Sequence, residues 1–135
     1  MSLLHTVRRA VTITPPGWPR AATLAWQWAP LLLWMVVIFV LSHQPKENIP
    51  DAGQWDLFVK KGAHFAGYAV LWLLARRAGF APWSAFILSV AYAAGDELHQ
   101  RGIPGRNGQL LDVFVDAAGA VTALALAGWL RRRPR

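Results

Sequence analysis

The chain has 135 residues, of which 55% are apolar, 16% are charged and none is cysteine. Disordered chains need low hydrophobicity and disulfide-stapled scaffolds need cysteine, so both classes are excluded. A soluble domain carries about 25% charged residues. The deficit here and the positive mean hydropathy therefore indicate a membrane protein. The formal net charge of +7 leaves two interpretations, a nucleic-acid partner or charges sorted across a bilayer.

Four apolar runs approach the length of about 20 residues that crosses the hydrocarbon core of a bilayer. They cover 24–41, the stretch between Lys61 and Arg76, 78–95 and 113–130. A soluble helical bundle is the main rival interpretation, but it would need polar faces that the first and third runs lack. The second run is short, yet Arg76 and Arg77 lead almost directly into the third, as expected for antiparallel spans. The sequence predicts an all-α integral membrane protein whose four transmembrane helices form an up-down antiparallel bundle.

Both ends of the chain are predicted to be cytoplasmic tails. The N-terminal segment lacks the apolar core and cleavage site of a signal peptide, and Pro15, Pro16 and Pro19 oppose a helix there. We expect an N-terminal tail over 1–23, a four-helix membrane domain over 24–130 and a basic tail over 131–135.

The basic residues are distributed unevenly between the two ends of the predicted helices. With the N-terminus inside, the inner side holds nine basic residues and no acid, and the outer side holds five basic residues and all seven acids. An excess of Lys and Arg marks the cytoplasmic side, so the topology is predicted to be N-in and C-in, in the bacterial inner membrane. The basic residues form no single patch interleaved with stacking aromatics, which argues against a nucleic-acid partner.

Five tryptophans also fall near the predicted inner interface, where this residue is enriched in membrane proteins. They are Trp26, Trp28, Trp72, Trp83 and Trp129. We interpret all five as membrane anchors.

Most of the remaining polar residues gather at the predicted outer ends of the helices. His64 and Tyr68 are four residues apart and share a helical face, as do Asp112 and Asp116. Ionisable residues at membrane depth normally face the bundle interior or a wet cavity. His64 and Asp116 are the deepest of these residues, so we expect them to face each other or a shared cavity.

The end of the third run carries a further polar stripe. Asp96, His99 and Gln100 have the i, i+3, i+4 spacing of one helical face, whereas Glu97 is expected to point elsewhere, toward Arg101. The glycine-rich loop that follows supplies Arg106, which is able to pair with Asp112 or Asp96 or to bind an anion.

Two motifs in these segments carry a family resemblance. The segments are KGAHFAGYAVL (61–71) and DELHQ (96–100), the second followed by Pro104-Gly105-Arg106, Asp112, Asp116 and Gly119, with Ser42 and Gln44-Pro45 after the first span. Over residues 30 to 130 the chain resembles the VanZ-like family, with Lys60 standing where many relatives have an acid. The resemblance implies a small four-span bacterial membrane protein of the cell envelope, in a family associated with resistance to the glycopeptide teicoplanin, and it implies no established reaction.

Three functions remain open for the outer cluster. The polar residues could form an interhelical clamp, a binding site for an anionic headgroup or a catalytic site. The leading hypothesis is recognition of a membrane lipid or lipid-linked cell-wall precursor headgroup. The candidate binding residues are Lys61, His64, Tyr68, Asp96, Glu97, His99, Gln100, Arg106, Asp112 and Asp116.

Catalysis is left undecided by the sequence. A general base at His64 or His99, oriented by Asp96 or Asp116 and assisted by Glu97, is the arrangement that a headgroup-modifying enzyme would need. The spacing of the histidines and carboxylates matches no zinc motif, so we expect neither a metal nor a cofactor. Gly119 and Ala123 form a small-xxx-small pair that suits either the internal bundle or a homodimer.

Overall fold

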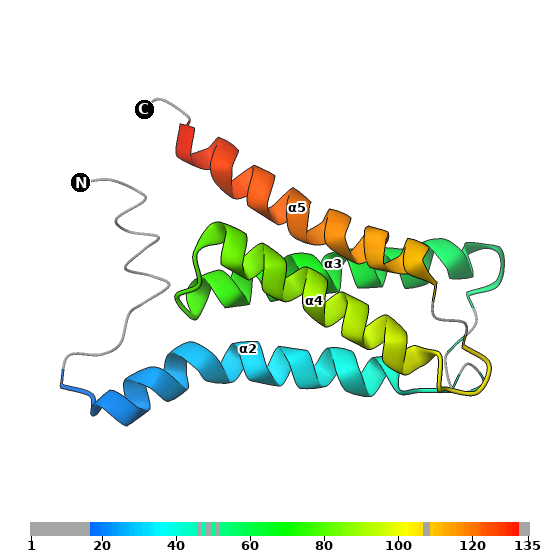
Figure 1. The fold of residues 1–135 in the computed structure, drawn as a ribbon, viewed down its shortest axis with the longest axis horizontal. Coiled ribbons are helices and arrows are strands. Elements are labelled where there is room, and N and C mark those ends of the chain that lie inside the picture. The colour runs from blue at the N-terminus through cyan, green and yellow to red at the C-terminus, as the bar shows by residue number, and fades with distance from the viewer. Residues whose placement is uncertain (1–16, 46, 48–49, 51, 107–108, 133–135) are drawn as a thin grey trace.

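The regular structure of the protein is entirely helical within the residues that the computed structural model describes, namely 17–45, 47, 50, 52–106 and 109–132. Four long helices follow one another along the chain, with one short 3₁₀ turn between the first two. They are α2 (Arg20–Ser42), η2 (Gly53–Trp55), α3 (Asp56–Arg77), α4 (Pro82–Gln100) and α5 (Leu110–Arg132). Successive long helices run in opposite directions (Figure 1). The predicted all-α class is confirmed.

Two of these helices, α2 and α5, are long and apolar enough to cross a membrane. Helices α2, α3 and α5 extend past both ends of their apolar runs, whereas α4 begins at Pro82, inside the run 78–95, and extends past its end to Gln100. The first turn of α2 begins directly after Pro19 and lies inside the predicted 1–23 tail. Residues 1–16 and 133–135 of the predicted tails, and residues 107–108 of the loop before α5, lie outside the described residues.

The helix ends define two chemically different ends of the bundle. At the basic end, α2 and α4 begin and α3 and α5 end. This end holds Arg20, Arg76, Arg77, Arg131 and Arg132, and no acidic residue of the described chain. At the polar end, α2 and α4 end and α3 and α5 begin, and the described acids lie there or within two turns of it.

The closest helix packing joins α3 to α5. A Cβ atom built on Gly119 of α5 would lie 2.1 Å from the carbonyl oxygen of Phe65 on α3, so only glycine fits at this crossing. Ala120 and Ala123 are also buried on α5, where small side chains let the two backbones approach. This crossing fixes the positions of the α3 and α5 residues that lie one to two turns closer to the polar end.

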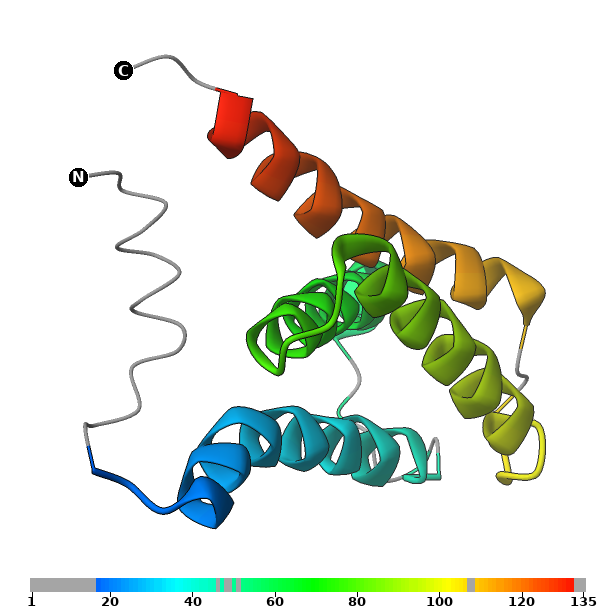
Figure 2. The ribbon, with the colours of Figure 1, turned by 60° about the vertical axis from the view of Figure 1, so that its left-hand side comes forward.

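Helix α2 lies apart from the other three helices over much of its length (Figure 2). Two long-range hydrogen bonds hold its middle. The indole Nε1 of Trp34 donates to the carbonyl oxygen of Gly67 at 2.9 Å, and the hydroxyl of Tyr92 donates to the carbonyl oxygen of Met35 at 2.6 Å. These bonds add to apolar packing, because Leu31 and Ile38 of α2 are buried in the core shared with α3 and α4.

One of the five tryptophans interpreted as anchors does not face the surroundings. Trp72 is 1% exposed in the core, and its indole Nε1 donates to the carbonyl oxygen of Pro82 at 3.1 Å. The anchor interpretation is therefore wrong for Trp72, because this face of α3 is covered by the start of α4. Trp26, Trp28, Trp83 and Trp129 are exposed on the bundle surface.

Candidate functional site

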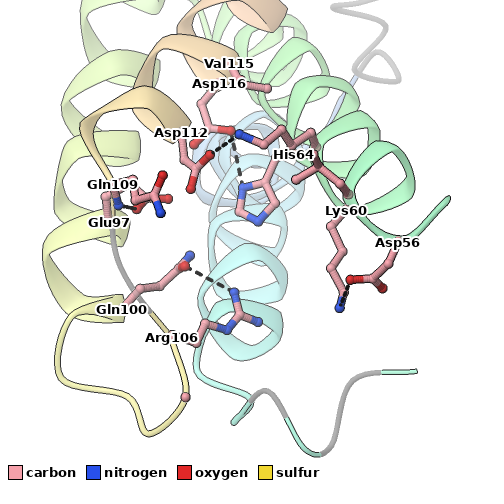
Figure 3. A pocket seen from close by; sticks show the side chains of 13 residues that line it. Asp56, Lys60, His64, Glu97, Gln100, Arg106, Gln109, Asp112, Val115 and Asp116 are labelled. Carbon is pink, nitrogen blue, oxygen red and sulfur yellow. Dashed lines mark hydrogen bonds and ion pairs between the residues drawn. The ribbon is translucent and has the colours of Figure 1, made fainter. Parts of the chain in front are cut away.

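A cavity of about 270 Å³ opens at the polar end of the bundle (Figure 3). Its walls come from α3, from the end of α4, from the loop between α4 and α5, and from the start of α5. The lining residues are Asp56, Leu57, Lys60, Lys61, His64, Glu97, Gln100, Gly105, Arg106, Gln109, Asp112, Val115 and Asp116. Ten of these thirteen residues are polar or charged, so this cavity is the main candidate for a functional site among the described residues.

Two contacts between α3 and α5 form one wall of the cavity. The ammonium of Lys61 lies 2.7 Å from Oδ1 of Asp112, and Nδ1 of His64 lies 3.3 Å from Oδ1 of Asp116. The i, i+4 spacing of Asp112 and Asp116 places both carboxylates toward α3. His64 and Asp116 face each other, as expected from their depth in the predicted membrane helices.

Asp116 is the most deeply buried charged residue at the cavity. Its side chain is 0% exposed, and neither carboxylate oxygen has a hydrogen-bond partner among the described residues. His64 is in ion-pair contact with Asp116, but the geometry of this contact is not that of a hydrogen bond. A buried carboxylate without donors is costly, so Asp116 is a place where a ligand could contribute them.

Glu97, one of the predicted binding residues, forms the opposite wall. The carboxylate is buried, and its Oε2 accepts a hydrogen bond from the backbone N–H of Gln109 at 3.0 Å. Glu97 therefore points away from Asp96, as expected, but toward the start of α5 and not toward Arg101. The physical reason is the start of α5, whose free backbone N–H groups and positive dipole end favour a carboxylate beside them.

A hydrogen-bonded chain joins α2, α4 and the loop at the mouth of the cavity. The Ser42 hydroxyl donates to Oδ2 of Asp96 at 2.6 Å, and Nε2 of Gln100 donates to the same oxygen at 3.1 Å. The other amide atom of Gln100, Oε1, accepts from Nη1 of Arg106 at 3.1 Å. Asp96 is thus directed toward α2 and outside the cavity lining, while its partner Gln100 reaches the cavity.

Arg106 binds the end of α2 in place of a carboxylate. Its Nε donates to the carbonyl oxygen of Gln44 at 3.1 Å, and its Nη2 donates to the carbonyl oxygen of Leu41 at 3.2 Å. Of the alternatives left open for Arg106, pairing with Asp112 or Asp96 is therefore not the one that the structure shows. Leu41 lies in the last turn of α2, where the negative end of the helix dipole favours a cation such as the guanidinium.

His99 lies outside the cavity on the side of α2. Its Nε2 is 3.0 Å from Nδ1 of His43, and its ring centroid is 4.7 Å from that of Phe39. The sequence placed His99 on one stripe with Asp96, and both do face α2, but Asp96 is buried whereas His99 is half-buried at the surface. The histidine is therefore removed from His64, the other candidate base.

Tyr68 also lies outside the cavity lining. It is 1% exposed in the core, one turn deeper than His64, with the two ring centroids 6.4 Å apart and nearly parallel. Its hydroxyl has no hydrogen-bond partner among the described residues. The ring of Tyr68 therefore stacks on the His64 ring from the core side.

The structure thus divides the ten sequence-predicted binding residues into two groups. Seven line the cavity, namely Lys61, His64, Glu97, Gln100, Arg106, Asp112 and Asp116. Three do not, namely Tyr68, Asp96 and His99. The predicted binding set omitted the other six lining residues, which include the polar residues Asp56, Lys60 and Gln109. The spacing of Lys60 four residues before His64 is the signal that could have included the lysine.

Metal binding has no ready site in the described part of the chain. Within it, no group of three or more His, Cys, Asp or Glu side chains is arranged to hold a metal ion.

A family model described as VanZ/LLP1 matches residues 27–131. The chain belongs to the VanZ/LLP1 family. The match covers α2 from its second turn through all but the last residue of α5, so it includes every residue that lines the cavity. Neither a curated protein nor a solved structure matches the chain. Family membership together with the two apolar helices α2 and α5 indicates a membrane protein of the VanZ type.

Proposed function

We propose that this VanZ-type protein is a four-span protein of the bacterial inner membrane that binds the headgroup of a lipid or lipid-linked cell-wall precursor. The membrane domain covers 24–130 between two tails, and the cavity at the polar end opens on the outer side. The protein would act in the cell envelope, where a protein of a family associated with glycopeptide resistance is expected to act.

The length and surface of α3 and α4 support the four-span topology. With 22 and 19 residues at about 1.5 Å each, they measure about 33 Å and 28 Å, close to the ~30 Å hydrocarbon core. Both helices also expose large apolar side chains, as α2 and α5 do, including Phe58 on α3 and Ile87 on α4. A bundle with apolar side chains on the outside of all four helices suits a lipid environment.

The distribution of charge supports the orientation. The basic end of the described chain has five arginines and no acid. Since excess Lys and Arg marks the cytoplasmic side, the basic end lies inside and the cavity outside.

One observation carries the binding function, the state of Arg106 at the cavity. A guanidinium has five N–H donors, and the three hydrogen bonds of Arg106 use one from each nitrogen. Among the described residues, one N–H on each terminal nitrogen has no acceptor, and two N–H donors on the two terminal nitrogens of a guanidinium are able to hold a phosphate. All three acceptors are neutral oxygens, so the positive charge of Arg106 has no carboxylate against it in these bonds.

The surroundings of the cavity favour a lipid as the source of the phosphate. Leu57 and Val115 line the cavity beside the charged residues. On the same helices, Phe58 and Phe114 are each 70% exposed and adjoin these two residues. A headgroup in the cavity would therefore have apolar surface next to it for its acyl chains.

The proposal is tested by native mass spectrometry of the full chain extracted from its own membrane. We expect a phosphate-bearing lipid to stay bound to wild type and to Arg101→Lys, an exposed loop control, and to be lost from Arg106→Lys. Lysine keeps the charge but cannot donate from two fixed nitrogens. Absence of any retained phosphate lipid on wild type, or equal retention by Arg106→Lys, would contradict the proposal.

An enzyme is the second candidate, favoured by the contact between His64 and Asp116 at the cavity. A carboxylate beside an imidazole orients a general base. Of the four candidate catalytic residues, His64 and Glu97 line the cavity, and Asp96 and His99 do not. Headgroup release from a retained lipid by wild type, abolished in His64→Gln, would favour the enzyme over the binder.

The clamp hypothesis applies to a different part of the same cluster. The Ser42–Asp96 and Lys61–Asp112 contacts each join two helices. A pure clamp would lose stability on substitution of these residues, and Arg106→Lys would leave lipid retention unchanged.

A further inference from the structure

The cavity carries opposite charges in different places. Arg106 lies on the loop at the mouth of the cavity, whereas Asp116 lies deeper along α5 (Figure 3). Four other charged residues of the lining are paired with one another. Lys60 lies 2.6 Å from Asp56, and Lys61 lies 2.7 Å from Asp112. The charges of the lining left without an opposite side-chain charge are therefore those of Arg106, Glu97 and, when His64 is neutral, Asp116.

The balance of these charges disfavours a ligand that is only anionic. The lining holds three cationic side chains, Lys60, Lys61 and Arg106, against four carboxylates. When His64 is neutral, a phosphate alone would satisfy Arg106 and add negative charge beside carboxylates that already exceed the cations. A ligand that brings its own cation avoids this repulsion.

Asp116 indicates where that cation binds. Its side chain is fully buried and lines the cavity, and both of its oxygens are without hydrogen-bond donors in the described chain. Buried carboxylates are normally supplied with donors. A group with several N–H bonds and a positive charge would donate to both oxygens and balance the negative charge of the carboxylate.

We propose that the cavity binds a headgroup of the phosphoethanolamine class, with the phosphate on Arg106 and the primary ammonium on Asp116. This inference rests on the proposed function and names its ligand. A primary ammonium has three N–H donors, as a lysine side chain does. A choline group has none, and a glycerol group has donors but no charge, so neither satisfies the buried carboxylate fully.

Glu97 adds a second acceptor for the same ammonium. One of its oxygens, Oε2, is held by the backbone N–H of Gln109, which fixes the carboxylate on the wall of the cavity. Asp116 and Glu97 approach the cavity from α5 and α4, so an ammonium between them would be bound from two sides.

The experiment reconstitutes the full chain in nanodiscs of equimolar phosphatidylethanolamine, phosphatidylcholine and phosphatidylglycerol, followed by release into detergent and native mass spectrometry. We expect phosphatidylethanolamine to be retained about tenfold or more over the other two, the factor that corresponds to one unsatisfied buried acceptor. Asp116→Asn and Glu97→Gln should each lower this preference, whereas Glu47→Gln, an exposed carboxylate at the same end, should keep it.

Competition with soluble headgroups needs no variant and separates headgroup binding from acyl-chain binding. Free phosphoethanolamine should displace the retained lipid from wild type, and free phosphocholine should not. Displacement by neither compound would assign retention to the acyl chains and overturn the proposal. Binding of free phosphoethanolamine without retention of the lipid would support this headgroup chemistry and contradict a lipid as its source.

The failure of this inference differs from the failure of the proposed function. Preferential retention of phosphatidylglycerol or phosphatidylcholine, lost in Arg106→Lys, would overturn the ammonium site and leave headgroup binding intact. Absence of any retained phosphate lipid, together with no binding of free phosphoethanolamine, would overturn both.

Discussion

The two ends of the bundle satisfy their polar groups in different ways. At the basic end the contacts are mostly local. The turn after α3 closes through the N–H of Phe80 on the carbonyl of Ala75, and the Arg76 guanidinium donates to the carbonyl of Phe80. At the polar end the partners are far apart in sequence, as in Ser42 with Asp96 and Lys61 with Asp112.

This difference separates orientation from function. In the proposed topology, the basic end supplies the charge that orients the protein in the membrane, and its exposed tryptophans lie at the interface. The polar end joins all four helices and surrounds a cavity, and Asp116 has no hydrogen-bond donor among the residues that the structure describes. Substitutions should therefore disturb the polar end more than the basic end, and the following predictions compare the two, beginning with the largest effect.

The largest effect is expected at the α3–α5 crossing just beneath the polar cavity. Gly119→Ala would bring a methyl group 2.1 Å from the Phe65 carbonyl oxygen, so the two backbones must separate. We expect the free energy of unfolding to fall by about 3 kcal/mol. Unfolding by SDS in mixed micelles measures the change.

Gly128→Ala is the matched control toward the basic end of the same helix, where a Cβ atom would meet nothing within 4 Å. It should leave stability unchanged or raise it slightly, because alanine favours a helix more than glycine does. Equal effects of the two substitutions would show that the crossing is looser than described.

A smaller effect is expected for the hydrogen bond that joins α2 to α4. Ser42→Ala leaves Asp96 with Gln100 as its one remaining side-chain donor. We expect a loss of about 1 to 2 kcal/mol in the same unfolding assay, at the upper end for interhelical bonds because the acceptor is a buried carboxylate. Thr122→Ala, which removes a hydroxyl bonded within α5, should cost less.

At the basic end, the corresponding contact between helices should contribute less. The guanidinium carbon of Arg77 on α3 lies 5.0 Å from the ring centroid of Trp26 on α2. Arg77→Gln is expected to lower the unfolding free energy by about 0.5 to 1 kcal/mol, the range for an exposed cation–π contact. A loss larger than that of Ser42→Ala would reverse the comparison between the two ends.

The smallest effect concerns the partly exposed pair Lys60 and Asp56 on the first turns of α3. The i, i+4 pair has side chains about one-third and one-quarter exposed. Lys60→Gln should change the unfolding free energy by only about 0.3 to 0.5 kcal/mol, and less in high salt. A salt-independent effect would show that Lys60 has a buried role.

The sequence was sufficient for the helices and for part of the cavity. Apolar runs locate α2 and α5 because membrane-length helices need continuous apolar residues. The depth of His64 and Asp116 predicts that they face each other, because an ionisable group at membrane depth normally faces the bundle interior or a wet cavity. The i, i+4 spacing of Asp112 and Asp116 places both on the α3 side.

The remaining site residues depend on how helices meet, which spacing within one helix does not specify. Glu97 is directed by the backbone N–H of Gln109, and Arg106 by the carbonyls of Leu41 and Gln44. Backbone groups have no side-chain signature, so these partners could not be read from residue types. Trp72 was misassigned for a similar reason, since its partner is the carbonyl of Pro82.

The central claim is that the polar end faces outward and the basic end inward, with all four helices crossing the membrane. The chain has no cysteine, so single cysteines can be introduced at will. Two exposed positions decide the matter: Arg101 after α4 and Ala81 in the turn before it. The measurement is labelling of each single-cysteine variant by a membrane-impermeant maleimide on intact spheroplasts.

We predict that Arg101→Cys is labelled on intact spheroplasts and that Ala81→Cys is labelled only after the membrane is permeabilised. Labelling of both positions from outside would show that α3 and α4 do not cross the membrane. Labelling of Ala81→Cys alone would place the cavity in the cytoplasm. Either of these two results would contradict the account.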